Sequence, residues 1–379
     1  MVKKIVIFGG TFDPPHIEHI NMAKACDDEL SPDLFIVIPT FEPPHKRTLF
    51  CASPTDRIEM CRLSFSGMKN VVISDYEIQN EGKSYTYLTV EHFAEVYPCA
   101  DIYFLLGTDM LTSFDKWKFP DRILKKVKLV LCSRDGENIS ADEAISEFHR
   151  KFPDEITKIS YIGKDMSSTE YKTSRMLGLD TSHMTSPEVN EYVIKNNVYP
   201  ADKYFKFISE NLKPSRVIHT EGVILTSLAF AKKLGVDSYK TLLAALLHDC
   251  AKYLDYRDFD GFKLPENVPQ PVIHQYLGEY VAREILGVTD NEVLNAIRYH
   301  TTGRPKMTKL EKIIFCADMV ERSRDYPELE FLRQSLRENF EQGFYECLKA
   351  SVDFVKASGN QVFDLSLKAL SYYKNIMEV

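Results

Sequence analysis

Several features are scarce or missing in this 379-residue sequence, and each absence narrows the class of protein. The eight cysteines form no CxxC pair and lie mostly in apolar segments, which favours buried thiols in a reducing compartment and argues against disulfides. No apolar run approaches the length of a membrane span, and the run in the opening MVKKIVIFGG is too short for a signal peptide. We therefore expect a cytoplasmic protein with no membrane partner.

Positive charge is also in deficit. The 47 lysines and arginines are outnumbered by 55 acidic residues, and the formal net charge of −8 argues against a nonspecific duplex-binding surface. We expect no nucleic-acid partner, although nucleotide pockets stay possible. A hydrophobic content of 44% is typical of a globular protein. At about 150 residues per domain, the length predicts two or three domains.

The first half of the sequence alternates short apolar runs with helical segments. Continuous β-branched and aromatic runs are typical of strands buried on both faces, so this alternation predicts an α/β fold with a doubly wound parallel sheet. Ligands of such sheets bind beyond the carboxyl ends of the strands. The six predicted strands are Lys4–Phe8, Leu34–Pro39, Val71–Ser74, Ile102–Leu106, Val127–Cys132 and Ile156–Ile162.

The segment GGTFDPPHIEH follows the first predicted strand directly. Gly9 and Gly10 permit a tight turn and a close approach of the backbone to a ligand. His16 and His19 lie three residues apart at the expected start of a helix, where backbone N–H groups are free. Two imidazoles and these N–H groups would hold a triphosphate, and phosphoryl-type transfer requires mainly such positioning and charge.

The whole string is more specific than its glycines, and it resembles the nucleotidyltransferase superfamily with the (H/T)xGH signature. GGTFDPPH is similar to the bacterial nicotinate-nucleotide adenylyltransferases, and the resemblance spans about residues 1–200. Six further segments match in order: PPHK (43–46), SYT (84–86), LLGTDML (105–111), KW (116–117), SSTE (167–170) and YVIKNNVY (192–199).

This resemblance implies adenylyl transfer from ATP to nicotinate mononucleotide, with Mg²⁺ on the phosphates. It assigns His16 and His19 to the ATP phosphates and Lys46 to the substrate or pyrophosphate, all as catalytic residues. Thr86 and Trp117 would lie near the nicotinate ring. The remaining ATP or substrate contacts that it implies are Gly9, Gly10, Thr11, Phe12, Gly107, Asp109, Ser167, Ser168 and Thr169.

Three positions depart from the family pattern. Glu18 stands at the glycine of HxGH, Lys172 replaces an arginine whose bidentate fork grips phosphate, and Leu88 replaces a common aspartate. A carboxylate beside two imidazoles could repel a triphosphate. Two alternatives therefore stay open: a nucleotide-binding module without catalysis, and an adenylyltransferase for another acceptor such as phosphopantetheine.

After residue 200 the strand pattern stops. The stretch 196–214 is interpreted as a linker with one short amphipathic piece, so we predict domains at 1–200 and 201–379. Helix-capping signals such as Thr289-x-x-Glu292 and Thr308-x-x-Glu311 predict that the second domain is all-α.

Six polar residues in the second half lie on the inward, apolar faces of five helical stretches, because the adjacent His248 and Asp249 share one stretch. Burying six such groups would be costly without compensation, and a pair of metal ions would supply it. We assign Asp249 as a bridging ligand and expect Lys252, with Arg304 less directly, to contact phosphate. The six predicted ligands are His219, His248, Asp249, His274, His300 and Asp318.

The order H…HD…H…H…D resembles the HD-domain metal phosphohydrolases from about residue 215 onwards. The segments LLHDCAK, IRYHTTGRPKM and LEKIIFCADMVE are similar to the branch that cuts diadenosine tetraphosphate symmetrically into two ADP. That resemblance implies two ions, with iron favoured, and Asp249 and Lys252 as catalytic residues. The ligand spacing alone predicts only a binuclear phosphohydrolase. It does not choose the metal, because imidazole and carboxylate ligands suit iron, manganese or zinc.

Overall fold

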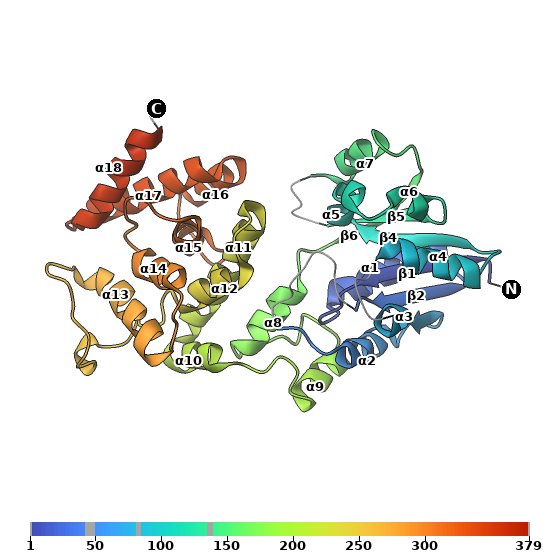
Figure 1. The fold of residues 1–379 in the computed structure, drawn as a ribbon, viewed down its shortest axis with the longest axis horizontal. Coiled ribbons are helices and arrows are strands. Elements are labelled where there is room, and N and C mark those ends of the chain that lie inside the picture. Colours follow the sequence, from blue (N-terminus) through green and yellow to red (C-terminus); the bar gives the residue numbers. More distant parts are fainter. Residues whose placement is uncertain (1, 42–49, 81–84, 135–138, 378–379) are drawn as a thin grey trace. The chain divides into compact units, whose positions relative to one another are not determined.

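The computed structural model describes residues 2–41, 50–80, 85–134 and 139–377 and consists of two compact units (Figure 1). The first unit holds Met1–Lys172 and Asp180–Pro200. The second holds Ala201–Val379 together with the short segment Thr173–Leu179. In the described part of the chain, no helix combines the length and apolar character that crossing a membrane requires.

The first unit is built on six parallel strands in the order β3-β2-β1-β4-β5-β6. Each strand lies on one of the predicted apolar runs, so the predicted doubly wound sheet is confirmed. The order reverses between β1 and β4, and in sheets of this kind ligands bind beyond the carboxyl ends of the strands at such a reversal. The strands are β1 (Lys4–Gly10), β2 (Leu34–Pro39), β3 (Val71–Ile73), β4 (Asp101–Gly107), β5 (Lys128–Arg134) and β6 (Ile156–Gly163).

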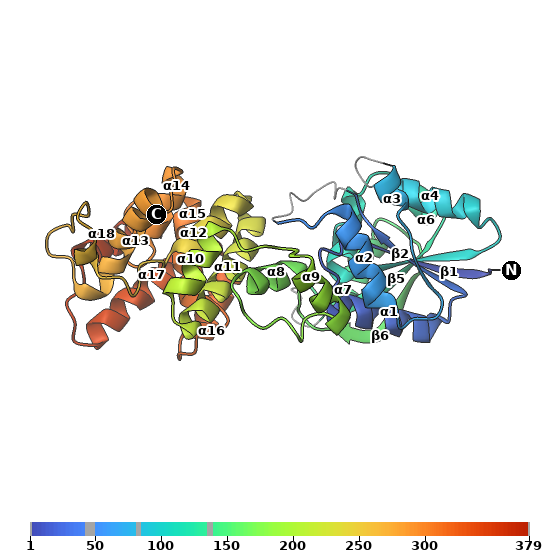
Figure 2. The same cartoon turned by 90° about the horizontal axis from the view of Figure 1, so that it is seen from below.

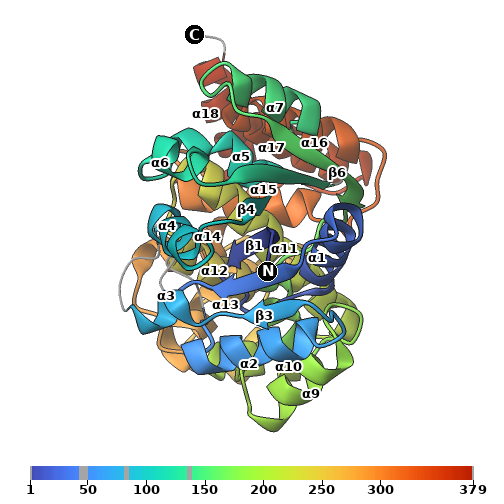
Figure 3. The same ribbon diagram turned by 90° about the vertical axis from the view of Figure 1, so that its right-hand side faces the viewer.

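Helices cover both faces of this sheet. On one face, α1 and α2 pack through residues such as Ile20 and Phe65. On the other face, helices α4 to α7 pack through residues such as Val90 and Phe148. Figures 2 and 3 show α1 and α4 on opposite sides of the sheet. The helices of this part of the chain are α1 (Ile17–Leu30), α2 (Pro54–Phe65), α3 (Tyr76–Gln79), α4 (Thr86–Val96), α5 (Thr108–Thr112), η1 (Phe114–Lys116), α6 (Pro120–Leu124), α7 (Ala141–His149), α8 (Ser168–Met176) and α9 (Pro187–Lys195).

All regular elements among the described residues of the second unit are helices, as the sequence predicts. Helix α11 packs against α12 and α15, and α14 packs against α12, α13 and α15, so the helices that carry the predicted ligands are neighbours. The helices are α10 (Lys203–Asn211), α11 (Pro214–Leu234), α12 (Ser238–Leu247), η2 (Tyr256–Asp258), η3 (Gln270–Val272), α13 (Ile273–Tyr280) with a π-helical continuation η4 (Val281–Ile285), α14 (Asn291–Tyr299), α15 (Lys309–Val320), α16 (Leu329–Glu338), α17 (Phe340–Ala357) and α18 (Asp364–Met377).

The short amphipathic piece predicted within 196–214 is present as α10, which buries Phe205 and Ile208 completely in the second unit. One local prediction is wrong. The cap of α14 is Asp290, whose carboxylate accepts from the N–H groups of the first turn, and Thr289 lies one position too early. The predicted capping box at Thr308 is present, with reciprocal bonds to Glu311.

Candidate functional sites

The loop after β1 ends in two histidines that begin helix α1. His16 is the N-cap residue and His19 occupies the third helical position, and their rings stack with centroids 3.6 Å apart. The backbone N–H of His16 donates to Nδ1 of His19 over 3.1 Å. Neutral His19 therefore carries its ring proton on Nε2, where it can act as a donor. The pair lies where backbone donors and the helix dipole favour an anion.

A buried ion pair holds the loop after β1 in place. Lys172 on α8 donates to Asp13 over 2.8 Å, and the two side chains are only 6% and 2% exposed. The other Asp13 oxygen accepts from the Tyr199 hydroxyl and the Ala52 N–H, each at 2.9 Å. Asp13 thus ties three distant segments to the loop, and its charge is compensated by Lys172.

Arg57 holds the same loop from a second direction, and sequence reasoning missed it. Its buried guanidinium donates to the carbonyls of Thr11 (2.9 Å) and Thr40 (2.6 Å), beyond the ends of β1 and β2. A third bond reaches the Phe41 carbonyl over 3.2 Å. The only sequence signal is an arginine among the inward positions of α2, which does not by itself indicate a binding loop.

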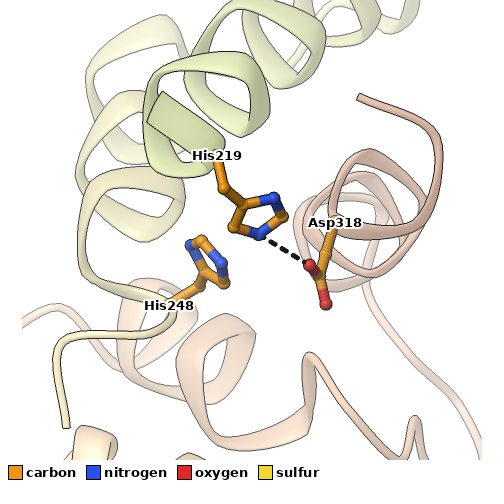
Figure 4. Close-up of side chains that lie close together, drawn as sticks. All are labelled: His219, His248 and Asp318. Carbon is orange, nitrogen blue, oxygen red and sulfur yellow. Dashed lines mark ion pairs between the residues drawn. The ribbon is translucent and has the colours of Figure 1, made fainter. Parts of the chain in front are cut away.

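In the second unit, His219, His248 and Asp318 converge from three helices (Figure 4). His219 lies on α11, His248 follows α12, and Asp318 lies on α15. The ligand-type atoms of the three residues lie within 4.8 Å of one another, and His219 Nε2 is 3.0 Å from Asp318 Oδ1. The structure thus brings together three of the six predicted ligands.

The other three predicted ligands form a second group of the same kind. Asp249 Oδ1 lies 3.2 Å from His274 Nε2 and 3.5 Å from His300 Nε2, and the two imidazole nitrogens are 3.1 Å apart. Asp249 also links the groups, because its Oδ2 lies 3.6 Å from His248 Nε2. All three residues are buried.

The hydrogen bonds on the outer side of these rings fit metal binding. A carbonyl can only accept, so Nδ1 of His248 donates to Ala245 and Nδ1 of His300 donates to Ile297, each over 2.7 Å. The lone pair of each neutral ring is then on Nε2, facing the group. Among the described residues, no hydrogen-bond partner exists for the buried atoms His219 Nε2, His248 Nε2 and Asp249 Oδ1. Buried polar atoms rarely lack a partner, and cations would satisfy all three.

The electrostatics of four of the six residues favour the protonation states that bind metal. His219 differs, because burial lowers its pKa but its contacts with Asp318 and Glu321 outweigh burial and raise the pKa. Burial lowers the pKa of His248 to about 3 and also lowers the pKa of His274, so both rings are neutral at pH 7. Burial raises the pKa of Asp249, but the close imidazoles of His248 and His274 and the charge of Lys252 outweigh burial and hold the pKa well below the usual value. Burial likewise raises the pKa of Asp318, and the close contact with His219 reverses the shift. Neutral imidazoles and ionised carboxylates are the ligand forms.

Three partly exposed cations surround the two groups. Lys252 Nζ lies 3.4 Å from Asp249 Oδ1 and 3.1 Å from His274 Nε2, so it lies in the site as expected. Arg216 reaches the same carboxylate over 3.0 Å, and Arg324 reaches Asp318 over 2.6 Å. Sequence analysis missed both arginines, because nothing in their spacing separates them from surface arginines.

Arg304 is directed elsewhere, against expectation. Its Nε and Nη2 donate to the two oxygens of the fully buried Glu311 over 2.7 and 2.8 Å. Glu311 would be left as an uncompensated buried charge without it. This arginine therefore has a structural partner that the sequence did not reveal.

Comparison with known proteins identifies both units. Residues 7–174 match the Cytidylyltransferase-like family, and residues 216–323 match the HD domain. A Clostridium tetani protein named probable nicotinate-nucleotide adenylyltransferase is 35% identical over 201 residues, which are 52% of this chain and 100% of that relative. The chain belongs to the nicotinate-nucleotide adenylyltransferase family.

Relatives named for two activities match most of this chain. A Mycoplasma genitalium protein named probable nicotinate-nucleotide adenylyltransferase/Ap4A hydrolase is 28% identical over 367 residues, covering 94% of this chain and 100% of that relative. A solved Clostridium acetobutylicum structure, described as a predicted HD superfamily hydrolase involved in NAD metabolism, is 31% identical. It covers 46% of this chain and 97% of that chain, with a TM-score of 0.44. The predicted resemblances to the nicotinate-nucleotide adenylyltransferases and to the HD domain are confirmed.

Two of the departures from the adenylyltransferase pattern have structural explanations. The Glu18 carboxylate is buried and accepts from the Tyr161 hydroxyl and the Lys164 N–H, each over 2.8 Å. Hydrogen-bond donors from β6 and the following loop therefore stabilise the charge of Glu18. Lys172 acts on Asp13 and not as a phosphate grip. Leu88 lies exposed on α4, and nothing in the structure explains its presence.

The remaining contacts implied for an adenylyltransferase lie around the same end of the sheet or outside the described residues. The Phe12 ring is buried in the core with Phe8 and Phe65, so a ligand contact of this residue would have to come from its backbone. Trp117 packs against Phe114, with centroids 5.0 Å apart, and is only partly buried. Lys46 lies outside the described residues. The other positions are Gly9, Gly10 and Thr11 at the β1 loop, Gly107 and Asp109 after β4, Thr86 starting α4, and Ser167, Ser168 and Thr169 at the start of α8.

Proposed function

We propose that the protein is a bifunctional enzyme. The first unit transfers an adenylyl group from ATP to nicotinate mononucleotide, giving deamido-NAD and pyrophosphate. The second unit hydrolyses diadenosine tetraphosphate to two ADP at a binuclear metal site. The observation that carries the second activity is the pair of three-residue ligand groups linked through Asp249. The relative with both activities in its name supports combining them.

The geometry of the first unit supports an in-line adenylyl transfer. A phosphate oxygen of nicotinate mononucleotide attacks the α-phosphorus of ATP, and the bond to the β-phosphate breaks as pyrophosphate leaves. His19, with its proton on Nε2, and the first N–H groups of α1 would donate to the phosphate oxygens that gain charge. Ser168 donates to the Pro14 carbonyl over 2.8 Å, which ties the start of α8 to the same loop. Mg²⁺ would accompany the phosphates.

In the second unit, the six ligands would hold two divalent ions, with iron favoured by the family resemblance. Bound metal would supply a nucleophile at neutral pH and polarise the attacked phosphate. Lys252, Arg216 and Arg324 border the ligand groups and would neutralise the polyphosphate chain. Attack on a central phosphorus breaks one phosphoanhydride bond and leaves ADP.

Two assays separate the proposals. Pyrophosphate release from ATP should require nicotinate mononucleotide and should not occur with phosphopantetheine; ATP binding without release in either mixture would indicate a non-catalytic nucleotide module. ADP should be the sole product from diadenosine tetraphosphate with metal-loaded protein. Hydrolysis of cyclic dinucleotides or nucleoside monophosphates in its place would reassign the second unit within the HD domains.

A further inference from the structure

We propose that Glu321 is a positioning residue for His219, and that Gly222 is glycine because the Glu321 carboxylate occupies the space of its side chain. The inference rests on the proposed metal site and concerns how one of its ligands is held. Neither residue belongs to the six predicted ligands. Both lie one helical turn or less from a ligand, Gly222 after His219 and Glu321 after Asp318.

The site histidines differ in the hydrogen-bond acceptor of Nδ1, the outer ring nitrogen that points away from the ligand group. His248 and His300 directly follow the last residues of α12 and α14, so each can donate from Nδ1 to a carbonyl three residues earlier in the final turn. Carbonyls in the last turn of a helix lack intrahelical partners and are available for this bond. His219 lies inside α11, where the equivalent carbonyl of Arg216 already accepts from the Thr220 hydroxyl over 2.9 Å. The outer nitrogen of His219 therefore requires an acceptor from another element.

Glu321 supplies that acceptor from the end of α15. Its Oε1 lies 2.9 Å from His219 Nδ1, and the residue is completely buried. The carboxylate is held in place by the Ser323 N–H (2.6 Å) and the Ser323 hydroxyl (2.5 Å). Because a carboxylate only accepts, the bond places the His219 proton on Nδ1 and leaves Nε2 to face Asp318 and the ligand group.

Gly222 makes room for this arrangement. A Cβ at this position would clash with Glu321 Oε2 and lie 3.0 Å from Glu321 Cδ. Glycine is unfavourable inside a helix, and Gly222 lies in the middle of α11 with a backbone that any residue could adopt. The lack of space for a Cβ beside the Glu321 carboxylate, and not the backbone conformation, therefore explains why residue 222 is glycine.

The roles of Glu321 and Gly222 can be tested without an activity assay, by measuring Mn²⁺ binding to protein that was first stripped of metal. We expect wild type to bind two equivalents of Mn²⁺ in equilibrium dialysis. Glu321→Gln should weaken one equivalent by about 10–100-fold and leave the other unchanged, because an outer-shell partner of one ligand group is altered. Glu330→Gln, exposed on α16, is the matched control and should bind as wild type.

A double variant distinguishes positioning from general damage. Gly222→Ala should weaken the same equivalent, since the methyl group displaces the carboxylate. In Gly222→Ala/Glu321→Asp the shorter side chain relieves the clash, so the combined loss should be smaller than the product of the losses measured for Gly222→Ala and Glu321→Asp alone. Circular dichroism at the assay temperature confirms that each variant is folded.

Each alternative result has a distinct meaning. If wild type binds Mn²⁺ and both single variants bind it equally well, the positioning role is wrong while the metal site stands. If the double variant shows the full product of the two losses, Gly222 and Glu321 do not act as a pair. If wild type binds no Mn²⁺, the proposed metal site fails, and the positioning role fails with it.

Discussion

The Asp249 carboxylate contacts both ligand groups, so metal binding and hydrolysis in the second unit should depend most on this residue. Its Oδ1 faces His274 and His300, and its Oδ2 faces His248. We expect Asp249→Ala to lose bound metal and hydrolase activity together, by more than about 100-fold in kcat/KM, because the loss of a ligand exceeds the loss of an outer-shell partner. Elemental analysis and the hydrolysis assay measure the two effects.

Asp260→Ala, at an exposed position in the same unit, should leave both quantities unchanged. Adenylyl transfer should persist in both variants. A preparation of Asp249→Ala that retains two equivalents of metal would contradict the shared role of this carboxylate.

The sequence revealed the six ligand residues because each lies in register with an apolar helix face, where a polar side chain is conspicuous. It did not reveal Arg216, Arg324 or Glu321. These residues follow no apolar register, and their importance depends on which helices become neighbours. Spacing identifies the ligands of a site more readily than it identifies the residues that hold them.

Lys172 illustrates how a residue-level interpretation changes once burial is known. In sequence, it resembles a weakened phosphate grip, and Lys172→Arg would be expected to raise activity. In the structure it neutralises Asp13 in a nearly inaccessible place. We now expect the larger arginine to overpack this position and to lower the stability of the first unit by about 1–3 kcal/mol.

Lys172→Met should cost more. It leaves the Asp13 carboxylate buried without a partner, and the expected loss in the free energy of unfolding is about 3–5 kcal/mol. Chemical denaturation measures the change. Lys158→Met is the control, because Lys158 pairs with Asp142 at the surface and should contribute less than about 1 kcal/mol. A loss of similar size in both variants would exclude a special role for the buried pair.

At the scale of elements, strands were easier to predict than helix junctions. All six strands follow from continuous apolar runs, because a strand covered on both faces has few polar residues. The amphipathic piece within 196–214 was predicted and is α10. The prolines and paired asparagines around it did not reveal that its apolar face packs in the second unit. The π-helical turn after α13 had no sequence signal.

The packing of α16 on α17 gives a prediction at this scale. A Cβ on Gly343 would lie 2.5 Å from the backbone nitrogen of Leu336, which cannot move as a side chain can. Helix propensity alone predicts that Gly343→Ala stabilises α17 by up to about 1 kcal/mol. We expect the opposite sign, a destabilisation of about 1–3 kcal/mol, because the two helices must separate.

Urea denaturation of the second-unit transition measures this change. Lys349→Ala, exposed on the same helix, should shift the transition by less than about 0.5 kcal/mol. A stabilised Gly343→Ala variant would show that the helices separate at little cost.

At the scale of the whole molecule, the chemistry is divided between the units. The six ligands lie between residues 219 and 318, whereas the two histidines of the β1 loop belong to the first unit. Treatment with a chelator should therefore abolish hydrolysis, and re-addition of Mg²⁺ alone should restore adenylyl transfer. Assaying both reactions on one chelated sample tests this division. Recovery of hydrolysis with Mg²⁺ alone would contradict a site of imidazole ligands, which suit transition metals better.

The same division should appear in thermal unfolding. Each unit has its own core, so calorimetry of the full chain should show two transitions. A ligand that binds only the folded form stabilises it by RT ln(1 + [L]/Kd), about 2.7 kcal/mol at 100 times Kd. Mn²⁺ should raise one transition and ATP with Mg²⁺ the other. Asp249→Ala should remove only the Mn²⁺ effect, since its ligand groups are disrupted while the β1 loop is untouched. A single transition raised equally by both ligands would mean that the two units unfold as one.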